Sequence, residues 1–333
     1  MVETLRIAIT GCGRAARVHL ERLLAVEGVR LVGCADPDVA AAENLATWAR
    51  AQQGEGDEIV VATDHRDLLK RARPAALAIF TPHLAHYRPA LDALQAGCHV
   101  FVEKPLSGNS QEAADIVGLA QARSRKVGVG HQFRLRPSLI ETRRRLAEGV
   151  IGTLRMVTAV LAQPWLEQQR GAENSWRFDA KIAGGGILAD AGDHLVDALL
   201  WTTGRGAVEV GALQSRLESG LDVVTAAAIR LEEGVPATLA IAGVTPGSLF
   251  AIDYFGEIGR LRATDQILRE RIHDGATRTI ELPEQSTSID ANFVAAVRGD
   301  APLCCPASEA VATVRLLEAI ARSASSLQIV KLS

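Results

Sequence analysis

The first part of the chain alternates short apolar runs with longer stretches of helical periodicity. Most of the segments between the apolar runs are long enough to form a helix. Strands separated by helices imply parallel strands joined by crossover connections, with helices on both faces of the sheet. We therefore predict a doubly wound α/β domain over residues 1–127. The strand-like runs are LRIAIT, VRLVGCA, IVVAT, AALAIFTP, HVFVEK and KVGVGHQF.

The pattern changes after Ile151, where strand-like runs follow one another with glycine-containing turns between them. Consecutive strands joined by turns favour an antiparallel sheet. Two helices are predicted beside this sheet, one from Gly186 to Thr203 and one from Ala307 to Ser323. We expect an α+β domain over residues 128–333 with a large, mostly antiparallel sheet. Its strand-like runs are TLRMVTAVLAQ, AVEVGALQSRL, DVVTAAAIRLEEG, VPATLAIAG, LFAIDYFGEIG and TRTIEL.

Composition narrows the class of partner. The 333 residues carry 36 Lys and Arg against 39 Asp and Glu, a net charge of −3. Nearly balanced charge offers no attraction to nucleic acid or to an anionic membrane surface. No stretch approaches the ~20 apolar residues of a membrane-spanning helix. A small-molecule partner is therefore expected.

The cysteines and the first residues of the sequence bear on the cellular compartment of the protein. The 5 cysteines are odd in number, and none of them forms a CxxC pair. No secretion signal precedes the first strand-like run, so we expect free thiols in a cytoplasmic protein. An antiparallel sheet without helices on both faces leaves a face to be buried, so we expect a homodimer or a homotetramer.

A glycine motif follows the first predicted strand. Gly11 and Gly13 begin a GxGxxA pattern that ends at Ala16. Arg14 and Ala15 lie between Gly13 and Ala16. Glycines at these positions permit a tight turn and let the backbone approach a pyrophosphate. A small residue at the third position lets the helix pack closely on the strand. An ordinary glycine turn is the alternative interpretation.

Asp36 ends the second predicted strand, where dinucleotide-binding folds place a carboxylate that accepts both ribose hydroxyls. A 2′-phosphate at this place would meet like charge, so NAD is favoured over NADP. Alternatively, Asp36 caps the following helix, with Pro37 in its first turn.

Candidate catalytic residues occupy two further segments. Lys104 lies in a Glu103-Lys104-Pro105 segment at the carboxyl end of the fifth predicted strand, where ligands bind in open parallel sheets. Asp190 and His194 follow a run of three glycines, at a spacing that places both on one helix face. A carboxylate beside an imidazole is a general-base arrangement. A surface lysine and a structural histidine are the alternatives.

Together these segments resemble the glucose-fructose oxidoreductase, inositol dehydrogenase and rhizopine catabolism family, Gfo/Idh/MocA, nearly from end to end. The stretch TPHLAHYRPALDALQAGCHVFVEKPL is similar to the family's TPN-x-x-H and EKP segments. The stretch WRFDAKIAGGGILADAGDHLVDALLW is similar to its W-R-x-D…GGG-x-L-x-D-x-G-x-H-x-x-D segment. Two positions depart from the pattern: His83 stands where the family usually has Asn, and a charged residue, Asp193, precedes His194.

The resemblance implies roles for individual residues. Lys104 would contact the reacting hydroxyl and the nicotinamide ribose, and His194 would remove the hydroxyl proton. Asp190 would orient or tune that pair. The resemblance also implies a cis peptide bond between Lys104 and Pro105. The cofactor contacts that we expect are Gly11, Gly13, Arg14, Ala15, Ala16, Asp36, Thr81, Pro82, His83, His86, Glu103 and Lys104.

The predicted substrate is a polyhydroxylated small molecule. His131, Trp176 and Arg177 are expected to join Lys104, Asp190 and His194 in binding it, although Trp176 could instead belong to the core. His83 and His86 lie three residues apart without a third ligand nearby in the sequence, so no metal is expected.

The sequence therefore predicts NAD-dependent hydride transfer at a secondary alcohol or ketone of a sugar, sugar acid or cyclitol. Two alternatives remain open. One is an NAD-dependent glycosidase that uses transient oxidation, and the other is a non-catalytic regulator that binds NAD.

Overall fold

The computed structural model describes residues 3–54, 58–171 and 175–332. They form two compact units: unit 1 contains Met1–Gly130 and Thr287–Val311, and unit 2 contains His131–Ser286 and Ala312–Ser333. The sequence pattern predicts that residues 287–311 belong to the second domain. The structure places them in unit 1, because helix α10 (Ile289–Arg298) packs on helix α1 (Arg14–Leu24) and Phe293 lies 5.6 Å from the Phe101 ring.

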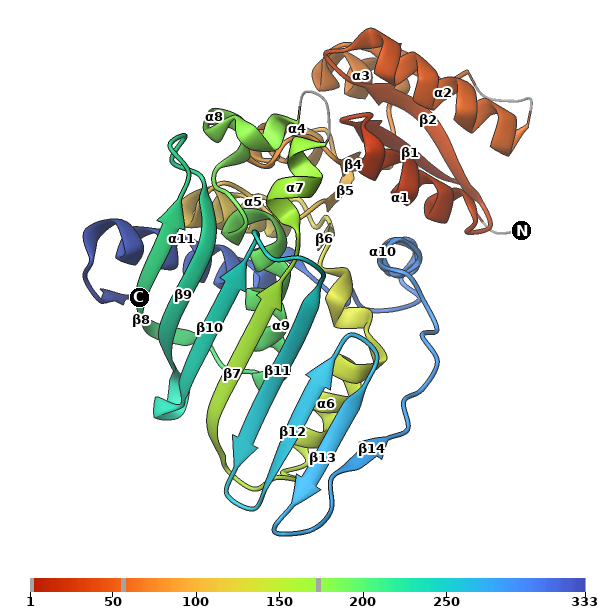
Figure 1. Ribbon diagram of the computed structural model, residues 1–333. Helices are drawn as coiled ribbons and strands as arrows, with labels where there is room; N and C mark the ends of the chain where they lie inside the picture. The colour runs from red at the N-terminus through yellow and green to blue at the C-terminus, as the bar shows by residue number, and fades with distance from the viewer. Residues whose placement is uncertain (1–2, 55–57, 172–174, 333) are drawn as a thin grey trace. The chain divides into compact units, whose positions relative to one another are not determined.

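Unit 1 is a parallel sheet in the order β3-β2-β1-β4-β5-β6 (Figure 1). Residues of β1 are buried almost without interruption, because helices cover both faces of the sheet. This confirms the doubly wound domain that the first half of the sequence predicts. The strands are β1 (Leu5–Thr10), β2 (Val29–Ala35), β3 (Val60–Ala62), β4 (Ala76–Ile79), β5 (His99–Val102) and β6 (Val127–Val129). The other helices are α2 (Val39–Gln53), α3 (His65–Ala72), η1 (His83–Ala85), α4 (Tyr87–Gln95) and α5 (Ser110–Ala122).

Unit 2 is built on a larger sheet in the order β14-β13-β12-β11-β7-β10-β9-β8-β15. Its strands pair antiparallel except for β10 with β7, which confirms the mostly antiparallel sheet. The strands are β7 (Leu154–Ala162), β8 (Ala207–Arg216), β9 (Asp222–Leu231), β10 (Pro236–Ala242), β11 (Leu249–Gly256), β12 (Gly259–Thr264), β13 (Leu268–Ile272), β14 (Arg278–Ile280) and β15 (Val330–Lys331).

The helical segments of unit 2 include a short π-helical turn, η4 (Leu188–Gly192), directly before α9 (Asp193–Thr203). The last helix, α11 (Ala307–Ser326), begins in unit 1 and ends in unit 2, three residues beyond its predicted end at Ser323. The remaining segments are η2 (Gln132–Leu135), α6 (Pro137–Ala147), α7 (Trp165–Arg170), η3 (Trp176–Phe178), α8 (Ala180–Ala183) and η5 (Glu232–Gly234).

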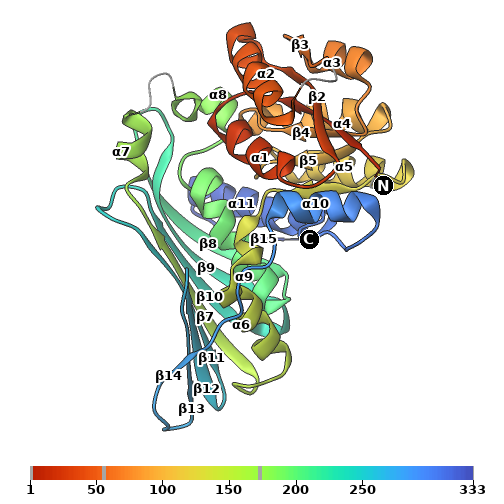
Figure 2. The ribbon, with the colours of Figure 1, turned by 90° about the vertical axis from the view of Figure 1, so that its right-hand side faces the viewer.

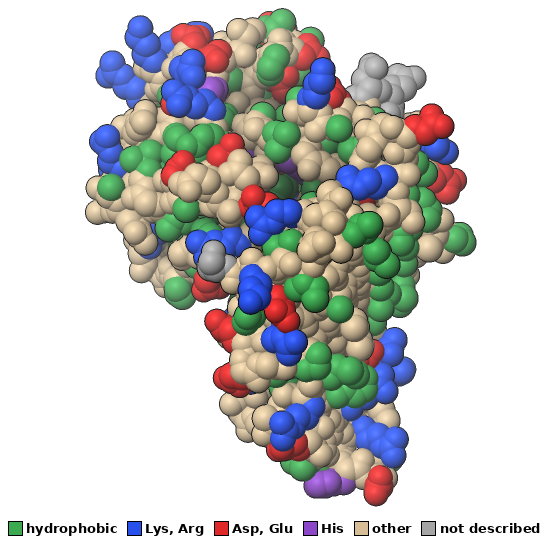
Figure 3. Space-filling view, turned by 90° about the vertical axis from the view of Figure 1, so that its left-hand side faces the viewer, with side chains coloured by type: hydrophobic (Ala, Val, Ile, Leu, Met, Phe, Trp, Pro, Cys, Tyr) green, Lys and Arg blue, Asp and Glu red, His purple; other side chains and the backbone are tan. Residues whose placement is uncertain are grey.

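The two faces of the unit 2 sheet differ. Along β9, Ala227 and Ile229 are buried, whereas Ala226 and Ala228 between and beside them are exposed. Helices α6 and α9 lie along the buried face (Figure 2), and residues of both helices belong to its apolar core. Among the described residues, Figures 1 and 2 show no helix lying along the opposite face of these strands. Hydrophobic side chains gather along the right-hand edge of Figure 3.

Candidate active site

The glycine loop of unit 1 has the conformation that the motif predicts. Gly11 has a φ of +82°, and a side chain there would place its Cβ 2.5 Å from the carbonyl carbon of Phe80. Gly13 is the N-cap of helix α1 and faces open space, since apart from its chain neighbours nothing lies within 4 Å of where its Cβ would be. Ala16 is fully buried. The loop thus leaves room beside the backbone at the start of α1, as a bound pyrophosphate requires.

Asp36 lies beside this loop at the end of β2. Its two carboxylate oxygens accept the backbone N–H groups of Cys12 at 2.7 Å and Asp38 at 2.9 Å. The cap of helix α2 is Asp38, whose side chain accepts the N–H of Ala40 at 3.0 Å. The helix-cap alternative for Asp36 is therefore wrong, and the loop holds its carboxylate in place at the edge where a ribose would lie.

His86 connects two loops at the same edge. It is fully buried, with Nδ1 2.7 Å from the carbonyl oxygen of Pro105 and Nε2 2.9 Å from that of Thr81. Burial lowers the pKa of His86. The hydrogen bonds to the two carbonyls raise it, but the effect of burial is larger. The neighbouring His83 is also buried, with ring centroids 6.1 Å apart. His86 thus braces the loop after β4 against the Lys104-Pro105 segment, whose peptide bond is cis as the resemblance implies.

A histidine that the sequence analysis did not single out lies behind Glu103. His19, on helix α1, places Nε2 2.9 Å from Glu103 Oε1 and Nδ1 2.6 Å from Asp290 Oδ1. Burial lowers the pKa of His19, but the hydrogen bonds to Asp290 and Glu103 outweigh it and raise the pKa to about 9. The sequence offers one clue, because helical periodicity places His19 on the buried face of α1 with Leu20 and Leu23.

Unit 2 holds Asp190 between two donors. Trp165 Nε1 donates to Asp190 Oδ2 at 2.8 Å, and Arg177 Nε donates to the same oxygen at 2.7 Å. The guanidinium of Arg177 also lies 4.4 Å from the Trp176 ring centroid. Trp176 is half-buried, whereas Trp165, which the sequence analysis did not select, is fully buried. The side chains of Trp165 and Arg177 thus fix Asp190 in place.

Each of the three glycines before Asp190 is required for a different structural reason. Gly184 ends α8 with a φ of +74°, and a Cβ on Gly185 would lie 2.9 Å from Ala189 Cβ. A Cβ on Gly186 would lie 1.9 Å from the carbonyl oxygen of Asp222 on β9. The Asp222 carboxylate accepts the N–H groups of Gly186 and Leu188, both at 2.8 Å. Close backbone approach is what the glycine run predicts, but its partner comes from a later strand.

The predicted helix from Gly186 to Thr203 needs correction at its start. The N–H of Gly192 bonds to the carbonyl of Ile187, five residues back, so the first turn is π-helical. Regular α-helix begins only at Asp193. The four-residue spacing of Asp190 and His194 therefore does not fall within one α-helix. The turn η4 carries Asp190, and the first turn of α9 carries His194.

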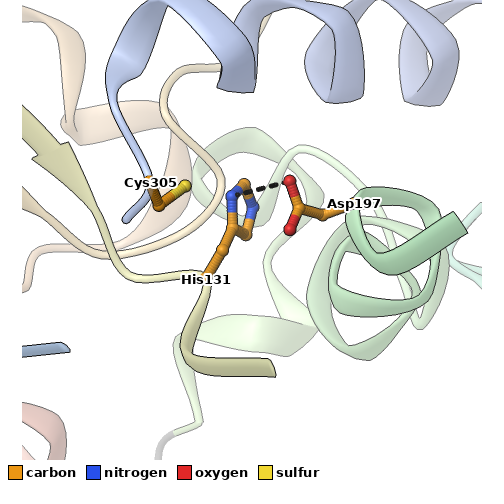
Figure 4. Close-up of side chains that lie close together, drawn as sticks. All are labelled: His131, Asp197 and Cys305. Carbon is orange, nitrogen blue, oxygen red and sulfur yellow. Dashed lines mark ion pairs between the residues drawn. The ribbon is translucent and has the colours of Figure 1, made fainter. Parts of the chain in front are cut away.

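His194 is held by an aromatic neighbour. Its ring stacks on Phe133 with centroids 4.4 Å apart and an interplanar angle of 12°. The adjacent residue, Asp193, accepts from His131 Nε2 at 2.5 Å, and His131 Nδ1 lies 3.2 Å from Asp197 Oδ1. Figure 4 shows His131 pointing toward Asp197. His131, expected to bind substrate, is buried and engages carboxylates with both ring nitrogens.

The buried cluster under His194 also contains Arg134, which donates to Asp197 from Nε at 2.9 Å and from Nη2 at 2.7 Å. Burial alone would raise the pKa of Asp197, but the charges of His131 and Arg134 hold it below its usual range. Thr313 donates to the same carboxylate at 3.2 Å. These bonds anchor the first two turns of α9, the helix that carries His194.

Each unit therefore brings together its own share of the predicted residues. At the carboxyl edge of the unit 1 sheet lie the glycine loop, Asp36, the Thr81 to His86 segment, Glu103 and Lys104. In unit 2, Arg177 bonds Asp190 on η4, and the His131 ring lies edge-on to His194 at the start of α9, with centroids 6.3 Å apart.

A doubly wound sheet with a glycine loop, followed by a unit with a mostly antiparallel sheet, defines the class of two-domain dinucleotide-binding oxidoreductases. Residues 5–131 match the oxidoreductase family with an NAD-binding Rossmann fold, and residues 139–262 match the GFO/IDH/MocA C-terminal domain. The chain belongs to the Gfo/Idh/MocA oxidoreductase family, as its motifs indicate.

Similar proteins span several activities. D-glucoside 3-dehydrogenase of Escherichia coli strain K12 is 27% identical over 62% of this chain and 56% of its own length. Rhizopine catabolism protein MocA of Rhizobium meliloti is 26% identical over 60% of this chain and 57% of its own. The alignments thus span little more than half of these two relatives. GenD2 from gentamicin A biosynthesis, solved in complex with NAD, shares the fold with a TM-score of 0.83 and 23% identity over 100% of this chain and 97% of its own.

None of the helices in the described part of the chain combines the length and apolar character that crossing a membrane demands.

Proposed function

We propose that this protein is an NAD-dependent dehydrogenase that acts on a secondary alcohol of a sugar, sugar acid or cyclitol, or reduces the corresponding ketone. The observation that carries the proposal is the carboxyl edge of the unit 1 sheet, where an open glycine loop, a held carboxylate and the Glu103-Lys104-Pro105 segment follow the parallel strands β1, β2 and β5. Membership of the oxidoreductase family and the dehydrogenase activity in the name of a relative support it.

The residues of unit 1 would hold the dinucleotide. Gly13 leaves space for the pyrophosphate at the start of α1, and Asp36 would accept the ribose hydroxyls. The carboxylate of Asp36 cannot turn aside without losing its bonds to two backbone N–H groups, so it would oppose a 2′-phosphate. We therefore propose a preference for NAD over NADP. When bound, NAD supplies the hydride acceptor or donor.

The proton chemistry is assigned to three side chains. His194 takes the proton of the substrate hydroxyl, as an imidazole does near neutral pH. Lys104 stabilises negative charge that develops on the same oxygen. Asp190, fixed by Trp165 and Arg177, orients the substrate hydroxyl or His194. Trp176 and Arg177 border Asp190 and are proposed to contact the substrate.

The test is NADH formation over a panel of polyols, aldoses and cyclitols, with Lys104→Ala and His194→Ala run in parallel. Each variant should lose about 100-fold or more in kcat, the size expected for acid-base groups. Lys70→Ala and His273→Ala are matched controls, because both residues are exposed. Turnover that survives both active-site substitutions would contradict the assignment.

Two other outcomes separate the alternatives. Release of product from aryl glycosides without net NADH formation would identify a glycosidase that uses transient oxidation. Binding of NADH without turnover of any substrate in the panel would favour a non-catalytic regulator. The set of Lys104, Asp190 and His194 argues against the regulator, because a protein that only binds NAD has no use for a general base.

We also propose that the protein assembles as a homodimer or homotetramer through the open face of the unit 2 sheet. Small exposed residues, such as Ala226, Ala228 and Ala240, make this face flat enough to pack against its own copy. Leu213, 66% exposed, lies at the edge of the same face. Light scattering at micromolar concentration should detect the oligomer, and Ala228→Glu should reduce its mass whereas Ala276→Glu, in an exposed segment between β13 and β14, should not. A monomeric wild-type protein would contradict the proposal.

A further inference from the structure

His19 connects helix α1 to two other segments of unit 1. One ring nitrogen meets Glu103, at the end of β5, and the other meets Asp290, on α10. The side chain of His19 is 7% exposed and that of Asp290 is 0% exposed. Phe80 stacks on the imidazole at 4.9 Å, and Phe101 lies 5.4 Å from it. The ring can therefore neither turn nor move away from the two carboxylates.

This arrangement determines the charge of the imidazole. Ionised carboxylates only accept hydrogen bonds, so each ring nitrogen facing one must carry a proton. A doubly protonated imidazole is a cation, and it offsets part of the negative charge that Asp290 and Glu103 bring into a buried site. Arg22 Nη1, at 3.8 Å from Asp290 Oδ2, is a longer contact.

The Glu103 carboxylate connects His19 to Lys104. Its Oε1 faces His19, and its Oε2 accepts the backbone N–H of Lys104 at 3.0 Å. Gly130 leaves the space that this carboxylate occupies, since a Cβ there would lie 2.8 Å from Oε1. One carboxylate thus joins the His19 ring to the backbone from which the Lys104 side chain extends.

We propose that His19, held by Asp290, is a positioning residue that orients Glu103 and through it Lys104 for the reaction. The proposal rests on the dehydrogenase function proposed above. Residues 287–311 belong to unit 1 and include Asp290. In this proposal the segment therefore contributes to the site as well as to packing. His19 itself contacts neither substrate nor reacting atoms in this scheme.

The test compares His19→Gln and Asp290→Asn with a matched control. His65→Gln removes another histidine of unit 1 that is paired with a carboxylate, at 2.9 Å from Asp92, on helix α3 and away from Glu103. Both test variants should lower kcat by about 10- to 100-fold, the cost of a misplaced reacting group. The KM for substrate and the dissociation constant of NADH should stay within about threefold, as expected when ground-state binding is kept.

A second readout does not depend on activity. The chain has 5 lysines, so protein labelled with ¹³C at lysine Cε gives few signals, and Lys104→Arg identifies that of Lys104. The Lys104 signal should move by more than its linewidth in His19→Gln and in Asp290→Asn, and stay in place in His65→Gln. In the wild-type protein, imidazole ¹⁵N shifts at neutral pH should show both nitrogens of His19 protonated.

Three results would overturn the role or the charge proposed for His19. An unmoved Lys104 signal in a folded His19→Gln or Asp290→Asn protein overturns the proposal, and so does a neutral His19 in the wild-type protein. A fall in kcat matched by an equal loss of NADH binding overturns it too, since that is the pattern of a merely structural residue. If no substrate turns over, the dehydrogenase assignment fails while the NMR signals still decide the role of His19.

Discussion

Each unit buries a histidine behind a residue that we assign to chemistry, but the two surroundings differ in charge balance. His131 shares one of its two carboxylates, that of Asp197, with the guanidinium of Arg134, whose side chain is 3% exposed. His19 faces two carboxylates, and the arginine near Asp290 is 46% exposed at 3.8 Å. His131 and Arg134 together balance the charge of Asp197 in unit 2, whereas in unit 1 the close contacts of both carboxylates are made by His19.

The difference predicts opposite responses to pH. The depressed pKa of Asp197 adds stability that is present above its ordinary pKa and is lost as pH falls through the lowered value. The raised pKa of His19 adds stability that is complete below its ordinary pKa of 6.5 and is lost as pH rises through about 9. Acid should therefore weaken the cluster of unit 2, and alkali that of unit 1.

The largest effect is expected in unit 2. Asp197→Ala leaves Arg134 and His131 buried without their shared carboxylate, which should cost about 3–5 kcal/mol of unfolding free energy. Urea denaturation followed by circular dichroism measures the loss. Asp265→Ala is the control, because Asp265 is 55% exposed where it pairs with Arg136, and it should cost less than about 1 kcal/mol. Equal losses from the two variants would show that burial does not set the strength of these pairs.

The next effect is the alkaline loss of stability in unit 1. Between neutral pH and about pH 10, release of the His19 proton should remove up to about 3 kcal/mol of unfolding free energy. The charged groups around His19 are Glu103 and Asp290, with Arg22 beyond Asp290. His19→Gln should be less stable at neutral pH, and the gap to wild type should narrow as pH rises. Denaturation curves that stay parallel across this range would contradict the charge assigned to His19.

The smallest effect tests whether Arg22 helps to balance the charge of Asp290. Because its side chain is 46% exposed and its contact is long, Arg22→Gln should cost less than about 1 kcal/mol. Arg134→Gln, measured in the same urea titration, should cost several times more, since Arg134 is buried and bonds Asp197 with two nitrogens. A comparable loss from both would mean that the two clusters are balanced in the same way.

Local patterns predicted much of the fold. The strands of unit 1 are short runs whose residues are nearly all buried, and their spacing by helices leaves few possible topologies. The alternation along β9 likewise predicts a sheet with one covered face. The helix expected from Gly186 failed at its first turn, because Asp222 on β9 binds the N–H groups of Gly186 and Leu188. That contact joins residues 36 and 34 positions apart, beyond the reach of helical periodicity.

In the candidate site, too, some features follow from the sequence and others only from the tertiary structure. By itself, the sequence determined the family and the glycine loop, and it predicted Asp36, Lys104, Asp190 and His194 as site residues, because these depend on residue types at short and regular spacings. Only the tertiary structure decided which groups hold them: Trp165 on Asp190, Phe133 on His194, and His19 on Glu103. The bond from His19 to Asp290 joins residues 271 positions apart. Charge and orientation at such a site come from burial and from neighbours that folding brings together, and neither is written in local spacing.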